Sequence, residues 1–133
     1  MNVTIPVSVG ELVDKITILK IKKNMITDRT KLKYISEEYD RLTTILQQYK
    51  LTYNIEIPVF LVDKLYSINL SLWNIEDQIR IKERNQDFGE EFVELARSVY
   101  LTNDQRFDVK SQISLYGKSD VHEQKSYEKY VDA

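Results

Sequence analysis

The sequence predicts an all-α fold, a bundle of four to five helices built around a long helical hairpin. Only three glycines and two prolines occur among 133 residues, so few positions break a helix. Long segments repeat apolar side chains every three or four residues, the spacing that places them on one face of a helix. A chain of this length suits one domain with a modest core, and we expect residues 1–133 to form a single helical domain.

The first helix is expected over about residues 9–25, beginning with a capping box. Ser8 and Glu11 have the S-x-x-E spacing in which each side chain satisfies a backbone donor of the other residue. Apolar side chains recur on two roughly opposite faces of this helix. Such a helix is sandwiched, either within the monomer or against another subunit. We therefore expect a homo-oligomer, most simply a two-fold dimer.

The helical pattern resumes over about residues 32–49, after a kink or short break near Thr27 and Asp28. Together with the first helix, this segment predicts the long hairpin. Residues 51–58 are the one plausible linker, because Pro58 ends one helix and is suited to start the next.

Two stripes run along the next expected helix, residues 59–84, and each follows the helical spacing. The helical step places Glu76 and Glu83 within about 60° of the centre of the apolar stripe, so we expect both to be at least half buried. The apolar stripe consists of Leu65, Ile68, Leu72, Ile75 and Ile79, and the polar stripe beside it of Asn69, Trp73, Glu76, Arg80 and Glu83.

Two further helices are expected after residue 84. Asp87 and Glu90 have the spacing of a second capping box, which predicts a helix that begins at Asp87. Thr102 or Asn103 is expected to cap a separate last helix, which ends near Gly117.

The two ends of the chain are expected to lie outside this helical bundle. Residues 1–7 read as an extended lead-in, because Pro6 restricts the backbone there. Residues 118–133 are expected to form a C-terminal tail or a short helix, with His122 solvated rather than catalytic.

The overall composition argues against a general affinity for polyanions. Apolar residues make up 42% and charged residues 30% of the chain, and the formal net charge is -2. This balance argues against DNA, RNA or an anionic membrane as partner. The lack of cysteine excludes disulfides, thiol catalysis and cysteine metal sites. No signal peptide or membrane-spanning run is recognised, so a cytoplasmic protein is expected.

Six carboxylates are expected to form a structural polar network between helices. A pair such as Glu76 with Arg80 contributes only about 0.2–0.5 kcal/mol on an exposed helix, whereas removing one partner of a buried pair costs about 3–5 kcal/mol. A closed salt-bridge network and the wall of an open pocket both fit the spacing. The expected members are Glu11, Asp14, Glu76, Asp77, Glu83 and Asp104.

Basic and aromatic side chains from several helices are candidates for an anion-binding site. Arginine side chains suit phosphates, and aromatic rings offer stacking surfaces for bases. Asn103 stands at an expected helix N-terminus, where backbone N–H groups favour anions. The alternative is that solvated cations and boundary tyrosines account for the pattern. The candidate ligand-binding residues are Lys15, Trp73, Arg80, Arg97, Tyr100, Arg106 and Lys110.

A magnesium site is a further alternative, because helical bundles build such sites from carboxylates on facing helices. All-α nucleotide pyrophosphohydrolases pair glutamates on one helix with Glu-x-x-Asp on the next, and the spacing here does not match that pattern. The sequence therefore predicts no catalytic residues, no metal and no cofactor, with Mg²⁺ entering only under the hydrolase alternative.

Four segments carry a family resemblance: IPVSVGELVDKITIL at 5–19, LWNIED with Ile79 and Arg80 at 72–80, LARSVY with Asn103 and Asp104 at 95–104, and KSY at 125–127. Over nearly its whole length the chain resembles an uncharacterised family of small helical proteins, known only as a domain of unknown function. The resemblance implies a helical fold and a setting in phages or beside, or fused to, bacterial glycan-assembly proteins. It implies no activity.

The leading hypothesis is a non-enzymatic protein that binds a small anionic ligand, a nucleotide or a nucleotide-derived signal. In a phage, such a protein would sequester a cyclic nucleotide of host immunity. One alternative is an accessory interaction module in surface-glycan assembly. The other is a Mg²⁺-dependent all-α nucleotide hydrolase.

Overall fold

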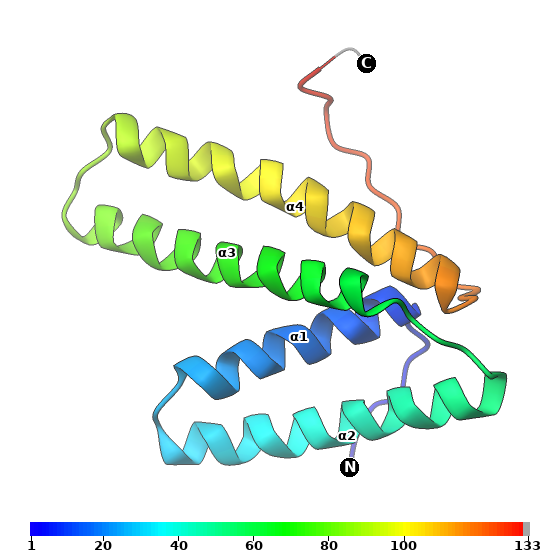
Figure 1. Cartoon of the computed structure of the whole chain (residues 1–133). Helices are drawn as coiled ribbons and strands as arrows, with labels where there is room; N and C mark the ends of the chain where they lie inside the picture. Colours follow the sequence, from blue (N-terminus) through cyan, green and yellow to red (C-terminus); the bar gives the residue numbers. More distant parts are fainter. Residues whose placement is uncertain (132–133) are drawn as a thin grey trace.

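The computed structural model describes residues 1–131 and confirms the all-α fold (Figure 1). Two helical hairpins lie one above the other, and residues 118–131 return along the last helix without regular structure. No strand occurs among the described residues. The four helices are α1 (Val9–Met25), α2 (Arg29–Tyr53), α3 (Val59–Arg84) and α4 (Glu90–Tyr116).

Helix α1 is the central element, because it packs against each of the other three helices. Its start is set by Ser8, whose hydroxyl accepts a hydrogen bond from the backbone N–H of Glu11 at 3.0 Å. Both apolar faces of α1 are therefore used within one chain. The two-faced pattern alone gives no reason to expect a second subunit.

The core lies where α1, α3 and α4 meet near the start of α3. Leu65 and Ile113 are fully buried there, and Val13, Leu61 and Val109 are each 1% exposed. Two linker side chains, Ile55 and Ile57, complete this core cluster. This core holds the N-terminal half of α1 against the C-terminal half of α4.

Helix α4 is continuous, so the expected break at Thr102 or Asn103 is wrong. No glycine or proline lies in this stretch, and the helical period runs through it without interruption. The prediction of a second capping box from Asp87 and Glu90 is also wrong. Helix α4 begins at Glu90 with Gly89 as its N-cap, and the carboxylate of Asp87 accepts from the Gly89 N–H at 3.3 Å instead.

Helix α2 lies at the outside of the molecule and has no buried side chain. It begins after Asp28, which caps it, and runs to Tyr53, past the expected start of the linker. Asn54 ends it in a left-handed conformation with φ of 50°.

The two ends of the chain are not helical in the described part. Residues 1–7 and 118–131 have no helix or strand, and residues 132–133 of the expected C-terminal segment lie outside the described part. None of the described helices combines the length and apolar character that crossing a membrane requires.

Candidate functional site

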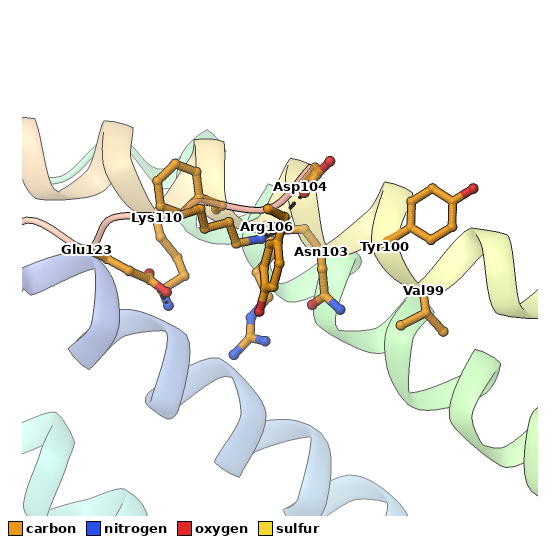
Figure 2. A pocket seen from close by; sticks show the side chains of 10 residues that line it. Val99, Tyr100, Asn103, Asp104, Arg106, Lys110 and Glu123 are labelled. Carbon is orange, nitrogen blue, oxygen red and sulfur yellow. Dashed lines mark hydrogen bonds and ion pairs between the residues drawn. The ribbon is translucent and has the colours of Figure 1, made fainter. Parts of the chain in front are cut away.

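A cavity of about 400 Å³ lies between α4 and the C-terminal segment; we refer to it as the tail cavity (Figure 2). Three cations, two carboxylates and three aromatic rings line it. Figure 2 shows Arg106 and Lys110 reaching from α4 toward α1, while Tyr100 stands at the rim. The lining residues are Val99, Tyr100, Asn103, Asp104, Arg106, Phe107, Lys110, Glu123, Lys125 and Tyr127.

Buried Asp14 holds Arg106, one of the residues that line this cavity. Its side chain is 1% exposed, and its carboxylate accepts hydrogen bonds from Nε of Arg106 at 2.9 Å and from Nη2 of the same side chain. The amide of Asn69 donates to the same carboxylate at 2.9 Å and to the hydroxyl of Thr17 at 2.9 Å. A buried carboxylate is stable only with such partners, so side chains of α1, α3 and α4 meet in one hydrogen-bonded network around Asp14.

The Asp14 contact fixes the orientation of Arg106. The hydrogen bonds from Arg106 to Asp14 raise the pKa of the guanidinium, so it stays charged. Both contacts use the Nε and Nη2 edge, and Nη1 has no hydrogen bond within residues 1–131. The Arg106 side chain is 28% exposed, and it lines the tail cavity. Arg106 is therefore a cation held in one orientation whose Nη1 can still donate hydrogen bonds, which suits binding an anion.

Lys110 is the most buried cation of the site, with its side chain 9% exposed. Its ammonium donates to Glu11 at 2.6 Å and lies 2.9 Å from Glu123 of the C-terminal segment. Burial lowers the pKa of Lys110, but its hydrogen bonds with the two glutamates outweigh burial and the pKa is raised. Figure 2 shows Glu123 directed at the Lys110 ammonium.

Lys125 brings a third cation over the cavity from the C-terminal segment. Its ammonium donates to the backbone carbonyl of Asn103 at 3.3 Å and lies 3.5 Å from Asp104. It also lies 5.3 Å from the ring centre of Phe107 and 5.8 Å from that of Tyr127. Positive charge and aromatic surface therefore share one wall.

A second hollow of about 340 Å³ lies on the other side of Arg106, between α1 and α3. Its lining is mainly apolar, with Leu72 and Trp73 from α3 and Ile21 from α1. Arg80 stands at its edge with its side chain 79% exposed. Arg106 lines both spaces, so it stands between them.

The seven candidate ligand-binding residues do not form one group in the structure. Tyr100, Arg106 and Lys110 line the tail cavity, whereas Trp73 and Arg80 line the second hollow with Arg106. The other two lie outside both spaces on exposed helix surface: Lys15, 3.8 Å from Glu11, and Arg97, 3.2 Å from Glu94.

The six network carboxylates divide in the same way. Glu11 and Asp14 belong to the network around Arg106 and Lys110, and Asp104 pairs with Lys125. The expected burial of Glu76 and Glu83 is wrong: both are exposed, as is Asp77, and the Glu76 side chain is 52% exposed. Helix α1 covers α3 as far as Asn69, and no side chain of α3 beyond Asn69 is buried.

Six lining residues were not among the predicted site residues: Val99, Asn103 and Phe107 on α4, and Glu123, Lys125 and Tyr127 on the C-terminal segment. Lys125 and Tyr127 belong to the KSY segment that carries part of the family resemblance. Sequence spacing alone does not reveal its partner, because an irregular segment has no periodic face.

Carboxylates of the described residues do not gather into a metal-binding cluster. No group of three or more His, Cys, Asp or Glu side chains within residues 1–131 is arranged to hold a metal ion. The buried carboxylate of Asp14 is instead held by Arg106 and Asn69. A hydrolase would need carboxylates that converge on an ion.

The model of a family of unknown function (DUF6165) matches residues 1–133. No curated protein and no solved structure matches the chain. The family description assigns no activity.

Proposed function

The chain belongs to the DUF6165 family, and we propose that it is a non-enzymatic protein that binds a small anionic ligand, a nucleotide, in the tail cavity. One observation carries this proposal. Three cations and three aromatic rings from α4 and the C-terminal segment converge on a single cavity of about 400 Å³. That volume is in the range of small-molecule sites.

The cations of the cavity suit a phosphate group. Arg106 is held by Asp14 on one edge and keeps its Nη1 donors available, and Lys110 stands one turn further along α4. A positioned guanidinium and a neighbouring ammonium form charge-assisted hydrogen bonds with phosphate oxygens at little cost in side-chain entropy.

The aromatic rings suit a base. The ring centres of Phe107 and Tyr127 lie 5.3 Å and 5.8 Å from the Lys125 ammonium, so a flat ring entering there meets both aromatic surface and a cation. Stacking on such a surface contributes about 1–3 kcal/mol per base. Phosphate and base contacts together favour a nucleotide over an inorganic anion.

The carboxylates of the cavity compete with the ligand for its cations. Glu123 already lies 2.9 Å from the Lys110 ammonium. A phosphate is expected to bind there by taking the place of this carboxylate, because the Lys110 ammonium also lies 2.6 Å from Glu11 and 4.0 Å from Asp14, so its three donors already face three carboxylates. The C-terminal segment is therefore expected to shift when a nucleotide binds.

The setting that fits this proposal is a cytoplasmic protein of a phage, or one that acts beside glycan assembly, and it holds its nucleotide without converting it. In a phage, the ligand would be a cyclic nucleotide of host immunity. Recovery of the nucleotide unchanged after incubation supports sequestration. Phosphate release that stops with EDTA would instead support the hydrolase alternative.

A calorimetric and thermal-shift screen with linear and cyclic adenine and guanine nucleotides tests the proposal. Lys125→Met is expected to weaken binding by about tenfold, because it removes a cation from the cavity. The matched control is Lys129→Met, which lies on the same segment and does not line the tail cavity. If no nucleotide binds, or both variants bind equally well, the proposal is wrong, and the interaction-module alternative takes its place.

A further inference from the structure

The chain exposes far more surface than a compact protein of its size. Its accessible surface is 9845 Å², whereas a folded monomer of 15.8 kDa exposes about 7300 Å². Part of this excess belongs to the irregular ends, residues 1–7 and 118–131. Another part belongs to the far end of the α3–α4 hairpin, residues 74–102, which we name the distal hairpin.

The distal hairpin has no buried side chain. Its turn lies at the far left of Figure 1, beyond the ends of α1 and α2. A groove of about 530 Å³ with a mainly apolar lining runs between its two helices, and Ile81 and Leu95 line this groove. Ile81 is 48% exposed and Phe88, beside the turn, is 49% exposed. Two helices alone do not cover their apolar side chains, and a third or fourth helix is needed.

The distal hairpin is acidic at its turn. Residues 83–94 carry five carboxylates against one arginine. Two of the carboxylates, Glu83 and Glu90, have no ion-pair partner within residues 1–131.

The α1–α2 turn has the opposite charge. Residues 20–33 carry six Lys or Arg side chains against one carboxylate. None of these six cations forms an ion pair in the described part of the chain. In Figure 1 this turn lies at the same end of the molecule as the α3–α4 turn, with α1 and α3 between them.

We infer that the partner of this end of the molecule is a second copy of the chain. A two-fold axis places the acidic turn of each copy against the basic turn of the other, so the same contact forms twice. The distal hairpins then cover each other's apolar grooves. An interface of standard size buries about 800 Å² on each copy, which the excess surface readily supplies.

Light scattering after size exclusion tests this inference. The full chain is expected to elute at twice 15.8 kDa in dilute salt. Its dimer dissociation constant is expected to rise at least about tenfold between 0.05 M and 0.5 M NaCl, because exposed charge pairs are screened. A 15.8 kDa species at high protein concentration in dilute salt would overturn the inference.

Two charge-reversal variants sharpen the test. Glu83→Lys with Glu90→Lys brings the formal charge of residues 83–94 from -4 to 0 and leaves the basic turn intact. Lys31→Glu with Lys33→Glu brings that of residues 20–33 from +5 to +1 and leaves the acidic turn intact. Each variant alone is expected to be monomeric. An equal mixture is expected to form mixed dimers, because the intact basic turn of one variant then faces the intact acidic turn of the other, which restores one of the two contacts. Circular dichroism checks that both variants fold.

The matched control is Glu56→Lys with Asp63→Lys, a double reversal at exposed positions in the linker and early α3. The control is expected to dimerise as the parent chain does. Loss of dimer in the control, or a mixture that stays monomeric, would contradict the two-fold arrangement. The readout needs no ligand, so it is independent of the proposed nucleotide site.

Discussion

The crossing of α1 with α4 and the distal hairpin contain the same kinds of side chains, yet only the crossing buries them. At the crossing, the carboxylate of Asp14 is 1% exposed and Arg106 binds it through two nitrogen atoms. In the distal hairpin, Arg80 lies 3.8 Å from Glu76, and these side chains are 79% and 52% exposed. The Asp14–Arg106 pair is buried because it lies where α1 packs against α4, whereas the Glu76–Arg80 pair lies beyond the part of α3 that α1 covers.

This difference shows what a helical pattern does and does not specify. The spacing of apolar and charged residues determines which side chains lie on the same face of a helix. Whether another helix covers that face depends on tertiary packing. The stability of the fold is therefore expected to depend on the crossing far more than on the distal hairpin.

The largest expected effect comes from Gly10→Ala at the crossing. A Cβ at Gly10 would overlap the backbone carbonyl of Lys110 and lie 2.7 Å from Oγ of Ser114, so the two helices must separate. We expect a loss of about 3 kcal/mol or more in the free energy of unfolding. The matched variant Gly89→Ala meets only Asp87, at 3.4 Å, and is expected to cost less than about 1 kcal/mol. Urea denaturation of both variants measures the difference, and equal losses would contradict the comparison.

A smaller effect is expected from Arg106→Leu, compared with Arg80→Leu. The first variant leaves Asp14 buried without its main partner, which costs about 3 kcal/mol. The second removes an exposed pair and is expected to change stability by less than about 1 kcal/mol. Thermal unfolding at neutral pH measures both. A similar change in melting temperature for the two variants would show that burial by α1 does not set the energetics.

The smallest effect is a dependence on alkaline pH. The pKa of Lys110 is raised in the folded chain above its ordinary value of 10.5, so the folded state holds this proton more tightly than the unfolded state. The stability that this proton contributes is fully present below pH 10.5 and is lost as the pH rises through the pKa that Lys110 has in the folded state. Lys110→Met is expected to flatten the fall in stability above pH 10.5.

The control for this measurement is Lys82→Met in the distal hairpin. The pKa of Lys82 is also raised, by hydrogen bonds to Glu91 and Asp87, but the side chains of these two partners are 81% and 52% exposed. Solvent and salt screen such contacts, so the variant is expected to leave the alkaline slope nearly unchanged. If both lysine variants flatten the fall in stability above pH 10.5 equally, the effect comes from loss of any lysine charge and not from the buried contacts of Lys110.

The helix starts and ends that depend on local chemistry were predictable from the sequence. The Ser8 cap and the span of α1 are confirmed, as is the span of α3 that follows Pro58. These features depend on residues within a few positions of each other. The predicted break in α4 was wrong because Asn103 was interpreted as a cap, whereas its inward side chain lines the tail cavity.

The candidate site was predictable only in part, because it depends on contacts between distant segments. Arg106 and Lys110 were identified from their spacing on one helix. Their partners, Asp14 on α1 and Glu123 on the C-terminal segment, lie far away in sequence, and no local pattern pairs them. The prediction that Glu76 and Glu83 are buried was wrong for the same reason, because the helical step does not show where α1 stops covering α3.

The contacts of Gly10 and Val9 have a consequence for the order of folding. The N–H of Gly10 donates to Ser114 and that of Val9 to Ser119, across 104 and 110 residues of chain. Such distant contacts form late, because almost the entire chain must close before they are made. During synthesis, Asp14 emerges long before Arg106, so the charge that α1 must bury has no arginine partner until the last helix leaves the ribosome. The first helix is thus expected to reach its final packing only when the protein is nearly complete.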